Sequence, residues 1–249
     1  MSTQVLSIAN QKGGVGKTTT TLSLGAALAR LGKRVLVMDL DPHACATIHL
    51  SFFPGTFTWS ALDIFKGGEV RRVIYKQKSF DFVPSHIQLS DLESDLKDVP
   101  GKGLILTNWI KKISTDYDYI LIDCPPQMGV LLVNALVAAD QVIIPIQTDF
   151  LALHGLKLIF DTMRLLNRVL KRPIHYRTLA TMYDRRARAC RRVLKLLRQK
   201  MGARMFSTVI NTDTKFREAS AKGKVILDYA PKSRGALEYM QLALEIIKA

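Results

Sequence analysis

The sequence has few cysteines and no long apolar run. Its 249 residues include three cysteines, Cys45, Cys124 and Cys190. They lack the even number and the C-x-x-C spacing of a disulfide framework or a zinc site, so we expect buried, reduced thiols. No apolar run reaches the roughly 18 residues that a membrane span needs, and no secretory signal pattern opens the chain. These absences predict a cytoplasmic protein without stable membrane insertion.

Acidic residues are nearly absent from one stretch of the chain. Between residues 164 and 204, fourteen lysines and arginines stand against one acid, Asp184, so this stretch carries +13 of the net charge of +15. Such a concentration predicts a polyanionic partner, which could be a nucleic acid, an anionic membrane or an acidic protein.

Residues 185–201 of this stretch have the pattern of an amphipathic helix, with one narrow apolar stripe and arginines over much of the remaining surface. The stripe comprises Cys190, Leu194, Leu197 and Met201. Because no acid within the helix relieves the repulsion between its cations, we favour a polyanion-binding surface over an ordinary solvated face.

A glycine-rich segment follows the first apolar run of the chain. Residues 5–8 predict a short strand, Gly13, Gly14 and Gly16 a tight turn, and Lys17 the beginning of a helix. Such a turn can aim backbone N–H groups at a polyphosphate, with the helix N-terminus adding positive potential. Lys17 can then reach the β- and γ-phosphates, and the Thr18 hydroxyl can ligate the accompanying Mg²⁺. The usual first glycine of this pattern is replaced by Gln11, and a second lysine, Lys12, precedes the glycines.

The run from Lys12 to Thr19, Lys-Gly-Gly-Val-Gly-Lys-Thr-Thr, resembles the deviant Walker A loop of the ParA/MinD family of P-loop ATPases. Asn10-Gln11 before it resembles the ParA (Soj) branch. The resemblance implies ATP and Mg²⁺ as cofactors and an ATP-dependent homodimer in which Lys12 crosses to the partner's nucleotide. The nucleotide contacts that it implies in the loop are Lys12, Gly13, Gly14, Val15, Gly16, Lys17, Thr18 and Thr19.

Two further apolar runs end in aspartates. Residues 35–38 predict a strand beside the P-loop strand, followed by Asp39 and Asp41, and residues 119–122 predict a Walker B strand that ends at Asp123. Carboxylates at the carboxyl ends of such strands face the phosphate site. By the family pattern, Asp41 positions the attacking water and is catalytic together with Lys12 and Lys17. Thr18, Asp39 and Asp123 form the metal site, with Asp39 acting through water.

Two positions depart from that pattern. His43 stands where the family usually has glutamine, and Gln127-Met128-Gly129 differs from the usual continuation of the Walker B motif. We interpret His43 as a tolerated neighbour of the catalytic segment in preference to a new catalytic group.

The remaining pattern predicts an α/β fold. We expect strands at 80–84, 141–146 and 178–183 and a further strand beginning at 206. We expect helices at 17–31, 59–65, 87–96, 103–113 and 233–249, and a long helix that follows from residues 148–156. No linker is visible, so residues 1–249 are expected to form a single P-loop NTPase domain, a mostly parallel twisted sheet with helices on both faces.

The resemblance also implies DNA contacts and the border of the adenine site. Aligned on the family, its two DNA-contacting arginines fall at Arg186 and Lys215, and the adenine border falls at Met182 and Asn211. Charge alone adds four DNA-binding candidates. These are Arg191, Arg192, Lys195 and Arg217.

The expected function is therefore that of a ParA-like, nucleoid-associated ATPase. It binds double-stranded DNA nonspecifically as an ATP-bound dimer, is released on hydrolysis with the help of a ParB-like activator, and acts in chromosome or plasmid partition. One alternative keeps this chemistry but positions another cargo, such as a chemoreceptor array or a flagellar assembly. A MinD-like membrane-surface ATPase is disfavoured, because the C-terminal segment lacks a basic amphipathic helix. An electron carrier would need cysteines for an iron–sulfur cluster, and the three scattered cysteines argue against it.

Overall fold

The structure, a computed structural model, describes residues 3–149, 152–170 and 173–248. Strands and helices alternate along the chain, and the strands form one eight-stranded sheet in the order β3-β4-β2-β5-β1-β6-β7-β8. The strands are β1 Gln4–Ile8, β2 Val35–Asp39, β3 Tyr75–Lys76, β4 Asp81–Val83, β5 Tyr119–Asp123, β6 Gln141–Gln147, β7 Tyr176–Tyr183 and β8 Met205–Asn211.

The sheet is mostly parallel, as predicted. Every pair of neighbouring strands is parallel except β3 and β4, at one edge. All five residues of β2 and of β5 are buried. Both strands are mostly apolar because helices cover a parallel sheet on both faces.

The prediction that the strand at 35–38 lies beside the P-loop strand was wrong. Strand β2 does not pair with β1. The Walker B strand β5 lies between them, hydrogen-bonded to both. This register makes the α-carbons of Asp39 and Asp123 direct cross-strand partners and places Ile8 opposite Asp123 on the other side. The phosphate loop and both aspartate-terminated strands therefore end at one edge of the sheet.

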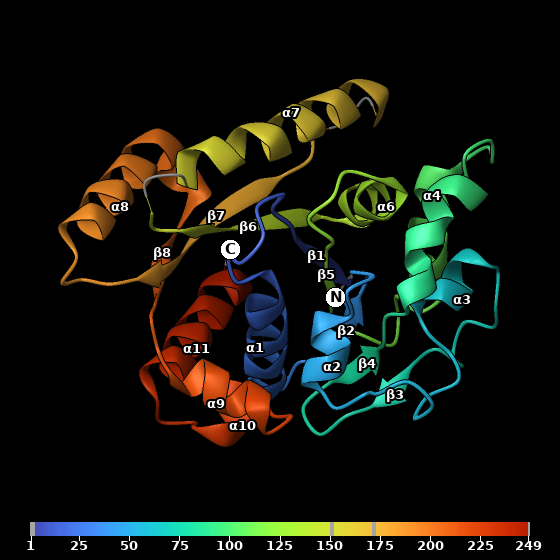
Figure 1. The fold of residues 1–249 in the computed structure, drawn as a ribbon, viewed down its shortest axis with the longest axis horizontal. Coiled ribbons are helices and arrows are strands. Elements are labelled where there is room, and N and C mark those ends of the chain that lie inside the picture. Colours follow the sequence, from blue (N-terminus) through green and yellow to red (C-terminus); the bar gives the residue numbers. More distant parts are fainter. Residues whose placement is uncertain (1–2, 150–151, 171–172, 249) are drawn as a thin grey trace.

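Helices cover both faces of the sheet (Figure 1). On one face, α1, α2, α9, α10 and α11 enclose a core that includes Leu24, Phe82 and Tyr239. On the other, α3 to α8 enclose a core that includes Trp109, Leu132 and Ile159. The helices are α1 Lys17–Arg30, α2 Cys45–His49, α3 Ala61–Phe65, α4 Leu92–Asp95, α5 Ile105–Lys111, α6 Val130–Ala138, α7 Ala152–Leu170, α8 Arg188–Met201, α9 Lys215–Ala221, α10 Ile226–Tyr229 and α11 Arg234–Ile247.

Two expected helices are shorter than the sequence pattern indicates. The segment expected at 87–96 begins as a 3₁₀ helix, Ile87–Asp91, before α4, and the segment expected at 103–113 begins with another, Lys102–Leu104, before α5. The sequence analysis did not identify β3, α2, α6, α9 or α10. No helix in the part of the chain that the structure describes is long and apolar enough to cross a membrane.

The cysteines only partly match the expectation of buried thiols. Cys124 is buried, but Cys45 is exposed and Cys190 is intermediate. Cys45 opens the short helix α2, whose inward positions are taken by Ala46 and Thr47. The prediction was wrong for Cys45 because the pattern did not reveal this helix.

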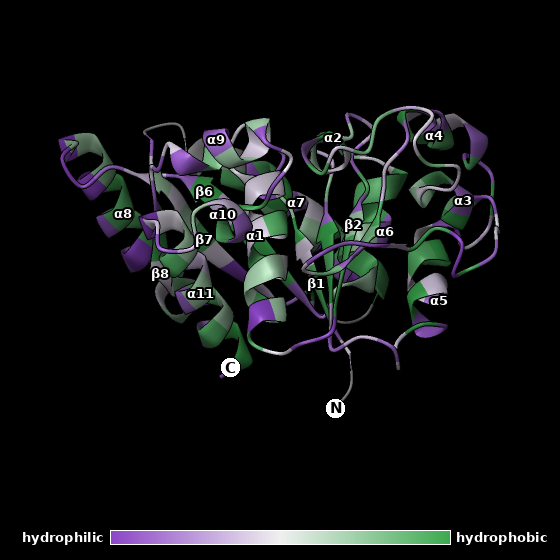
Figure 2. Ribbon diagram, turned by 90° about the horizontal axis from the view of Figure 1, so that it is seen from below, coloured by the Kyte–Doolittle hydropathy of each residue, from purple (hydrophilic) through white to green (hydrophobic). Residues whose placement is uncertain are grey.

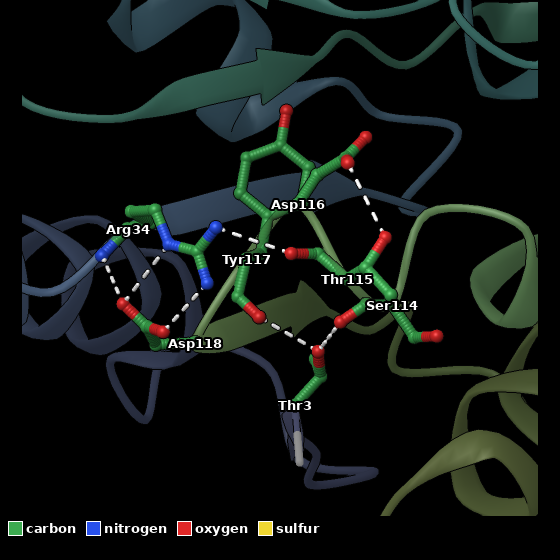
Figure 3. A network of polar contacts seen from close by, with 7 residues as sticks. All are labelled: Thr3, Arg34, Ser114, Thr115, Asp116, Tyr117 and Asp118. Atoms are coloured by element: carbon green, nitrogen blue, oxygen red, sulfur yellow. Dashed lines mark hydrogen bonds and ion pairs between the residues drawn. The ribbon is translucent and has the colours of Figure 1, made fainter. Parts of the chain in front are cut away.

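A polar network joins the amino ends of the central strands (Figure 3). Asp118 Oδ2 accepts a 2.8 Å hydrogen bond from the Arg34 backbone N–H, and Asp118 Oδ1 lies 2.9 Å from the Arg34 guanidinium. The Arg34 guanidinium also donates to the Thr115 carbonyl at 3.1 Å, and Thr3 Oγ1 donates to the Tyr117 carbonyl at 2.6 Å. Arg34 precedes β2, and Asp118 precedes β5, so the network fixes where these strands begin.

Replacing Asp118 with alanine should lower the free energy of unfolding by about 1 kcal/mol, because the Arg34 backbone N–H loses its acceptor and a partly exposed ion pair is removed. Urea denaturation measures this loss. The matched control is Asp116→Ala, which removes the ion pair with Arg71 at 2.8 Å and should cost less than about 0.5 kcal/mol. Equal losses in the two variants would contradict the role given to Asp118.

Candidate active site

The loop between β1 and α1 is fixed in shape by its own contacts. Gly14 and Gly16 have φ angles of 73° and 91°, in the left-handed region that favours glycine. Asn10 spans the turn, since its Nδ2 donates to the Pro145 carbonyl at 2.7 Å and its Oδ1 accepts from the Lys12 backbone at 2.9 Å. Thr181 Oγ1 donates to the Val15 carbonyl at 2.8 Å. The loop is thus held open by β6 and β7 as well as by its own glycines.

The first turn of α1 can receive an anion. Gly16 caps this 14-residue helix without a side-chain hydrogen bond, and the first turn contains no acidic residue. The free N–H groups and the helix dipole therefore favour negative charge at this point. The side chain of Lys17 is buried here, with 8% of the residue exposed. Burial of an ammonium group beside free backbone donors is the arrangement that a phosphate group completes.

Two carboxylates lie next to each other beneath the loop. Asp39 and Asp123 are at most 1% exposed. Asp39 Oδ2 accepts from the backbone and the hydroxyl of Thr47, at 2.9 and 2.7 Å, and its Oδ1 accepts from the Asp41 backbone at 3.1 Å. Asp123 Oδ1 lies 3.3 Å from the Thr21 hydroxyl, whereas its Oδ2 is buried without a hydrogen-bond partner.

Burial raises the pKa of both carboxyl groups. The pKa of Asp39 rises to about 6, mainly because its charged form is desolvated. The pKa of Asp123 is raised well above its usual value, first by burial and then by the negative charge of Asp39. Hydrogen bonding to Thr18 and the charge of Lys17 act in the opposite direction on Asp123. A cation between the phosphate loop and Asp123 would relieve both the desolvation and the repulsion.

The residues present fit Mg²⁺. The unpartnered Asp123 Oδ2 is an available oxygen ligand, and Thr18 supplies a hydroxyl near the same carboxylate. Across the described ranges, no group of three or more His, Cys, Asp or Glu side chains could hold a metal by itself. This donor set suits Mg²⁺, which binds through one or two carboxylates with water and substrate phosphates completing its shell.

Asp41 lies just beyond this pair and contacts His43. Asp41 Oδ1 accepts from the His43 backbone N–H at 3.0 Å and lies 2.9 Å from His43 Nδ1. The Asp41 carbonyl accepts from the Ser85 hydroxyl at 2.6 Å. The sequence interpretation treated His43 as a tolerated neighbour, and the pattern gave no signal that its ring would reach this carboxylate.

Lys12 is held within its own chain. Its Nζ lies 2.8 Å from Asp149 Oδ2, with about a third of each side chain exposed. Asp149 Oδ1 is buried and has no partner. The pair places Lys12 beside the loop, and its expected role across a dimer interface remains a prediction.

The two residues expected near the adenine, Met182 and Asn211, have different neighbours in the structure. Met182 has a left-handed φ of 51°, and its methyl carbon comes within 4.0 Å of where a side chain on Gly16 would begin, so it borders the phosphate loop. Asn211 is turned toward helix α11, where its Nδ2 and backbone N–H donate to Glu238 at 2.6 and 2.8 Å. Glu238 was not identified from the sequence, although an acid on the inner face of an apolar helix is a usable signal.

The basic residues predicted to bind DNA lie around the carboxyl ends of β7 and β8. Arg186 pairs with Asp184 at 3.1 Å in the loop before α8, and Lys215 pairs with Glu218 at 2.6 Å in α9. Arg191 donates to the carbonyls of Arg185 and Arg186 at 2.6 and 3.1 Å. The side chains of Arg192, Lys195 and Arg217 are exposed.

Not every cation of the basic stretch belongs to that surface. Arg177 is largely buried, paired with Glu245 at 2.6 Å and stacked 3.8 Å from the centre of the Phe206 ring. It therefore ties β7 to α11 and is unavailable to a partner. Lys171 and Arg172, also part of the stretch, lie outside the described residues.

An apolar cleft of about 310 Å³ opens beside Asp41. It lies between the segment after β2 and the segment after β5, and its lining includes Pro42, His43, Pro125 and Met128. Glu93 on α4 also lines the cleft and accepts a 2.5 Å hydrogen bond from the Val130 backbone N–H, at the first turn of α6. The cleft thus adjoins the segments that follow both aspartate-terminated strands.

The metal-free protein should become less stable as pH rises through the range from about 4 to about 6. In this range Asp39, with a native pKa of about 6 against 3.8 when unperturbed, binds a proton more tightly in the folded state than in the unfolded one. Its contribution therefore falls by on the order of 2 kcal/mol. Urea denaturation at several pH values in a chelator measures this. Asp123→Asn removes the neighbouring charge and should flatten the dependence; an unchanged slope would contradict the coupling of the two carboxylates.

Comparison with known proteins extends over nearly the whole chain. The family model for the AAA domain (AAA_31) matches residues 3–176. The chain is 37% identical to the sporulation initiation inhibitor protein Soj of Bacillus subtilis over 247 residues, covering 98% of each protein. It is 36% identical to the chromosome partitioning protein ParA of Caulobacter vibrioides, covering 98% of this chain and 94% of that relative.

Among solved structures, cobyrinic acid a,c-diamide synthase of Mycobacterium smegmatis with bound ATP analog and magnesium has a TM-score of 0.86 and 32% identity, covering 99% of this chain and 95% of the other. The same enzyme is also known with ADP and magnesium. These matches agree with the geometry of the phosphate loop, the buried aspartates and the unpartnered oxygen. The chain therefore belongs to the ParA/MinD family of P-loop ATPases, in its ParA (Soj) branch, and is an ATPase whose cofactors are ATP and Mg²⁺.

Proposed function

We propose that residues 1–249 act as one ATPase domain that dimerises on ATP, binds DNA nonspecifically and is released by hydrolysis, in chromosome or plasmid partition. The observation that carries the proposal is the surface of α8. Its exposed cations are not balanced by any acid in the helix. Relatives with partition functions in their names support the assignment to partition.

The packing of α8 leaves its cations free for a partner. Val193, Leu194 and Leu197 are buried against the sheet, whereas Met201 and Cys190, the other members of the predicted stripe, are intermediate. Figure 2 shows hydrophilic and hydrophobic segments alternating along this helix. Exposed cations lie on both sides of the buried residues. They are Arg188, Arg191, Arg192, Lys195, Arg198 and Lys200.

The sheet aligns the loop that carries Arg186 with the beginning of α9, where Lys215 lies. Tyr183 and Asn211 are cross-strand partners at the carboxyl ends of β7 and β8, and the Thr212 N–H donates to the Tyr183 carbonyl at 3.1 Å. Arg186 follows the first strand end by three residues and Lys215 follows the second by four. Each cation is paired with a partly exposed acid, whose side chain is 32% exposed for Asp184 and 39% exposed for Glu218. Such surface pairs contribute little stability. A phosphate can therefore replace Asp184 or Glu218 at small cost.

Nucleotide and DNA binding share one end of the sheet. Met182 lies at the end of β7, near Gly16 of the phosphate loop, and Arg186 follows four residues later. A second subunit that closes over the nucleotide would bring its own α8 toward the same polyanion. Two such surfaces bind more tightly than one because the second contact is intramolecular. This accounts for an ATP-dependent affinity for DNA without any base-specific contact.

The hydrolysis step is assigned to Asp41, Lys17 and Lys12. Asp41 would orient the attacking water, and Lys17 with the α1 N-terminus would stabilise charge on the phosphates. Lys12 would leave Asp149 and reach the partner subunit's nucleotide. Thr18 and Asp123 would hold Mg²⁺, which would neutralise part of the phosphate charge when bound. Release from DNA would follow when the phosphate that holds the two subunits together is lost.

Two alternatives keep the ATPase and change its target. A ParA-like ATPase that positions another large assembly would use the same surface, and only the identity of the cargo would differ. A MinD-like membrane ATPase is less well supported, because the buried residues of α8 face the sheet and leave Leu196 as its exposed large apolar side chain, 42% exposed. In the partition function proposed above, the protein is cytoplasmic, associates with the nucleoid and responds to a ParB-like activator.

Replacing Arg186 and Lys215 with alanine should weaken DNA binding at least tenfold, because each phosphate contact contributes through counterion release. Cosedimentation with plasmid DNA in the presence of ATP or ADP measures the effect, together with a salt titration whose slope should become shallower. Nucleotide binding should be unchanged.

The matched control is Arg71→Ala with Arg72→Ala, which removes the same charge from an exposed segment between α3 and β3, far from α8 (Figure 1). That variant should bind DNA nearly as the wild type does. Equal weakening of the two double variants would point to net charge alone and reject the α8 surface. Binding to anionic liposomes instead of DNA would favour the membrane alternative.

Replacing Asp41 with alanine should reduce ATP turnover by at least 100-fold while leaving ATP binding intact, because the group that orients the water is lost. The variant should also accumulate as an ATP-bound dimer on DNA. Steady-state turnover and size-exclusion chromatography test both points. Lys17→Ala is the comparison, since it should lose nucleotide binding itself; normal turnover by the Asp41 variant would reject the assignment.

A further inference from the structure

We propose that His43 is a positioning residue for ATP hydrolysis, which orients the carboxylate of Asp41. Two donors of one residue converge on one oxygen of that carboxylate. The His43 backbone N–H donates to Asp41 Oδ1 at 3.0 Å, and His43 Nδ1 lies 2.9 Å from the same atom. The inference rests on the hydrolytic role proposed for Asp41.

The direction of the ring hydrogen bond follows from the chemistry of its partner. An ionised carboxylate can only accept, so Nδ1 must carry the hydrogen, which leaves Nε2 as an acceptor in the neutral ring.

The backbone of Asp41 is fixed by other groups, but its carboxylate is not. Its N–H donates to Asp39 Oδ1 at 3.1 Å, and its carbonyl accepts from Ser85 Oγ and from the Ala44 N–H at 2.6 and 2.8 Å. Within the described ranges, His43 supplies the hydrogen bonds that the Asp41 carboxylate accepts. The imidazole therefore fixes the rotation of that carboxylate together with the His43 backbone N–H, and Oδ2 is left for a water molecule.

The surroundings favour positioning over a structural role for the ring. The His43 side chain is 63% exposed, whereas that of Asp41 is 11% exposed. An exposed ring contributes little buried area, so its loss should barely affect folding. It lines the apolar cleft together with Pro42, Pro125 and Met128. Its contact with a nearly buried carboxylate is therefore its main energetic effect.

The test compares three substitutions of His43 by kcat and KM for ATP. H43A should lower kcat about five- to tenfold with KM unchanged, as expected when one orienting hydrogen bond is lost. H43N should restore kcat to within about twofold, because its amide nitrogen can occupy the place of Nδ1. H43Q, whose amide extends to the place of Nε2, should restore less. Wild-type kcat in H43A, or equal kcat in all three variants, would overturn the proposal.

Two controls separate this inference from the role of Asp41. If Asp41→Ala keeps normal turnover, the proposed function of Asp41 fails and the inference fails with it. If Asp41→Ala is inactive and H43A is normal, only the inference fails. In the Asp41→Ala background, H43A should cause no further loss, because the group that it orients is gone. A second control is His86→Ala, which removes a histidine ring that accepts a 3.2 Å hydrogen bond from the Gln88 backbone N–H. This variant should leave kcat unchanged.

Discussion

The structure depends on the burial of two like charges side by side. Asp39 and Asp123 end neighbouring strands in direct register, and both are withdrawn from water. Their repulsion and desolvation are unfavourable in the protein alone, as the raised pKa of each shows. Thr47 and the Asp41 backbone satisfy Asp39, but one oxygen of Asp123 has no partner. The site is therefore completed by a cation, and a polyphosphate brings that cation with it.

The groups around this pair are held by contacts between distant parts of the chain. Lys12 is held by Asp149 from the segment after β6, and the phosphate loop is braced by Pro145 and Thr181. Asp41, in contrast, is held by a residue only two positions away. The carboxylate proposed to act in hydrolysis is thus oriented locally, while the groups proposed to bind phosphate are oriented by the sheet. A change in the segment after β2 can therefore alter hydrolysis without altering the binding loop.

The cations of the basic surface, unlike the buried carboxylates of the nucleotide site, contribute little to the fold. The cations of α8 are exposed. Arg186 and Lys215 form surface ion pairs, and Arg191 donates to two backbone carbonyls. The fold does not depend on these contacts. Arg177 shows the opposite case, since its ion pair with Glu245 and its contact with Phe206 make it part of the packing between β7 and α11. Charge that the fold does not use remains available to a polyanionic partner, which is the physical basis of the proposed DNA binding.

The sequence by itself determined the elements whose residues are contiguous. The phosphate loop, the aspartate-terminated strands and the amphipathic α8 are written in local spacing, since glycine conformation, strand burial and helix periodicity each act over a few residues. Only the tertiary structure decided which elements meet. The insertion of β5 between β1 and β2, the exposure of Cys45, the burial of Arg177 and the turn of Asn211 toward Glu238 all depend on strand order and on partners far along the chain. Local pattern fixes what an element is, whereas its neighbours are chosen by the packing of the whole chain, and so the contact of His43 with Asp41 became visible only in three dimensions.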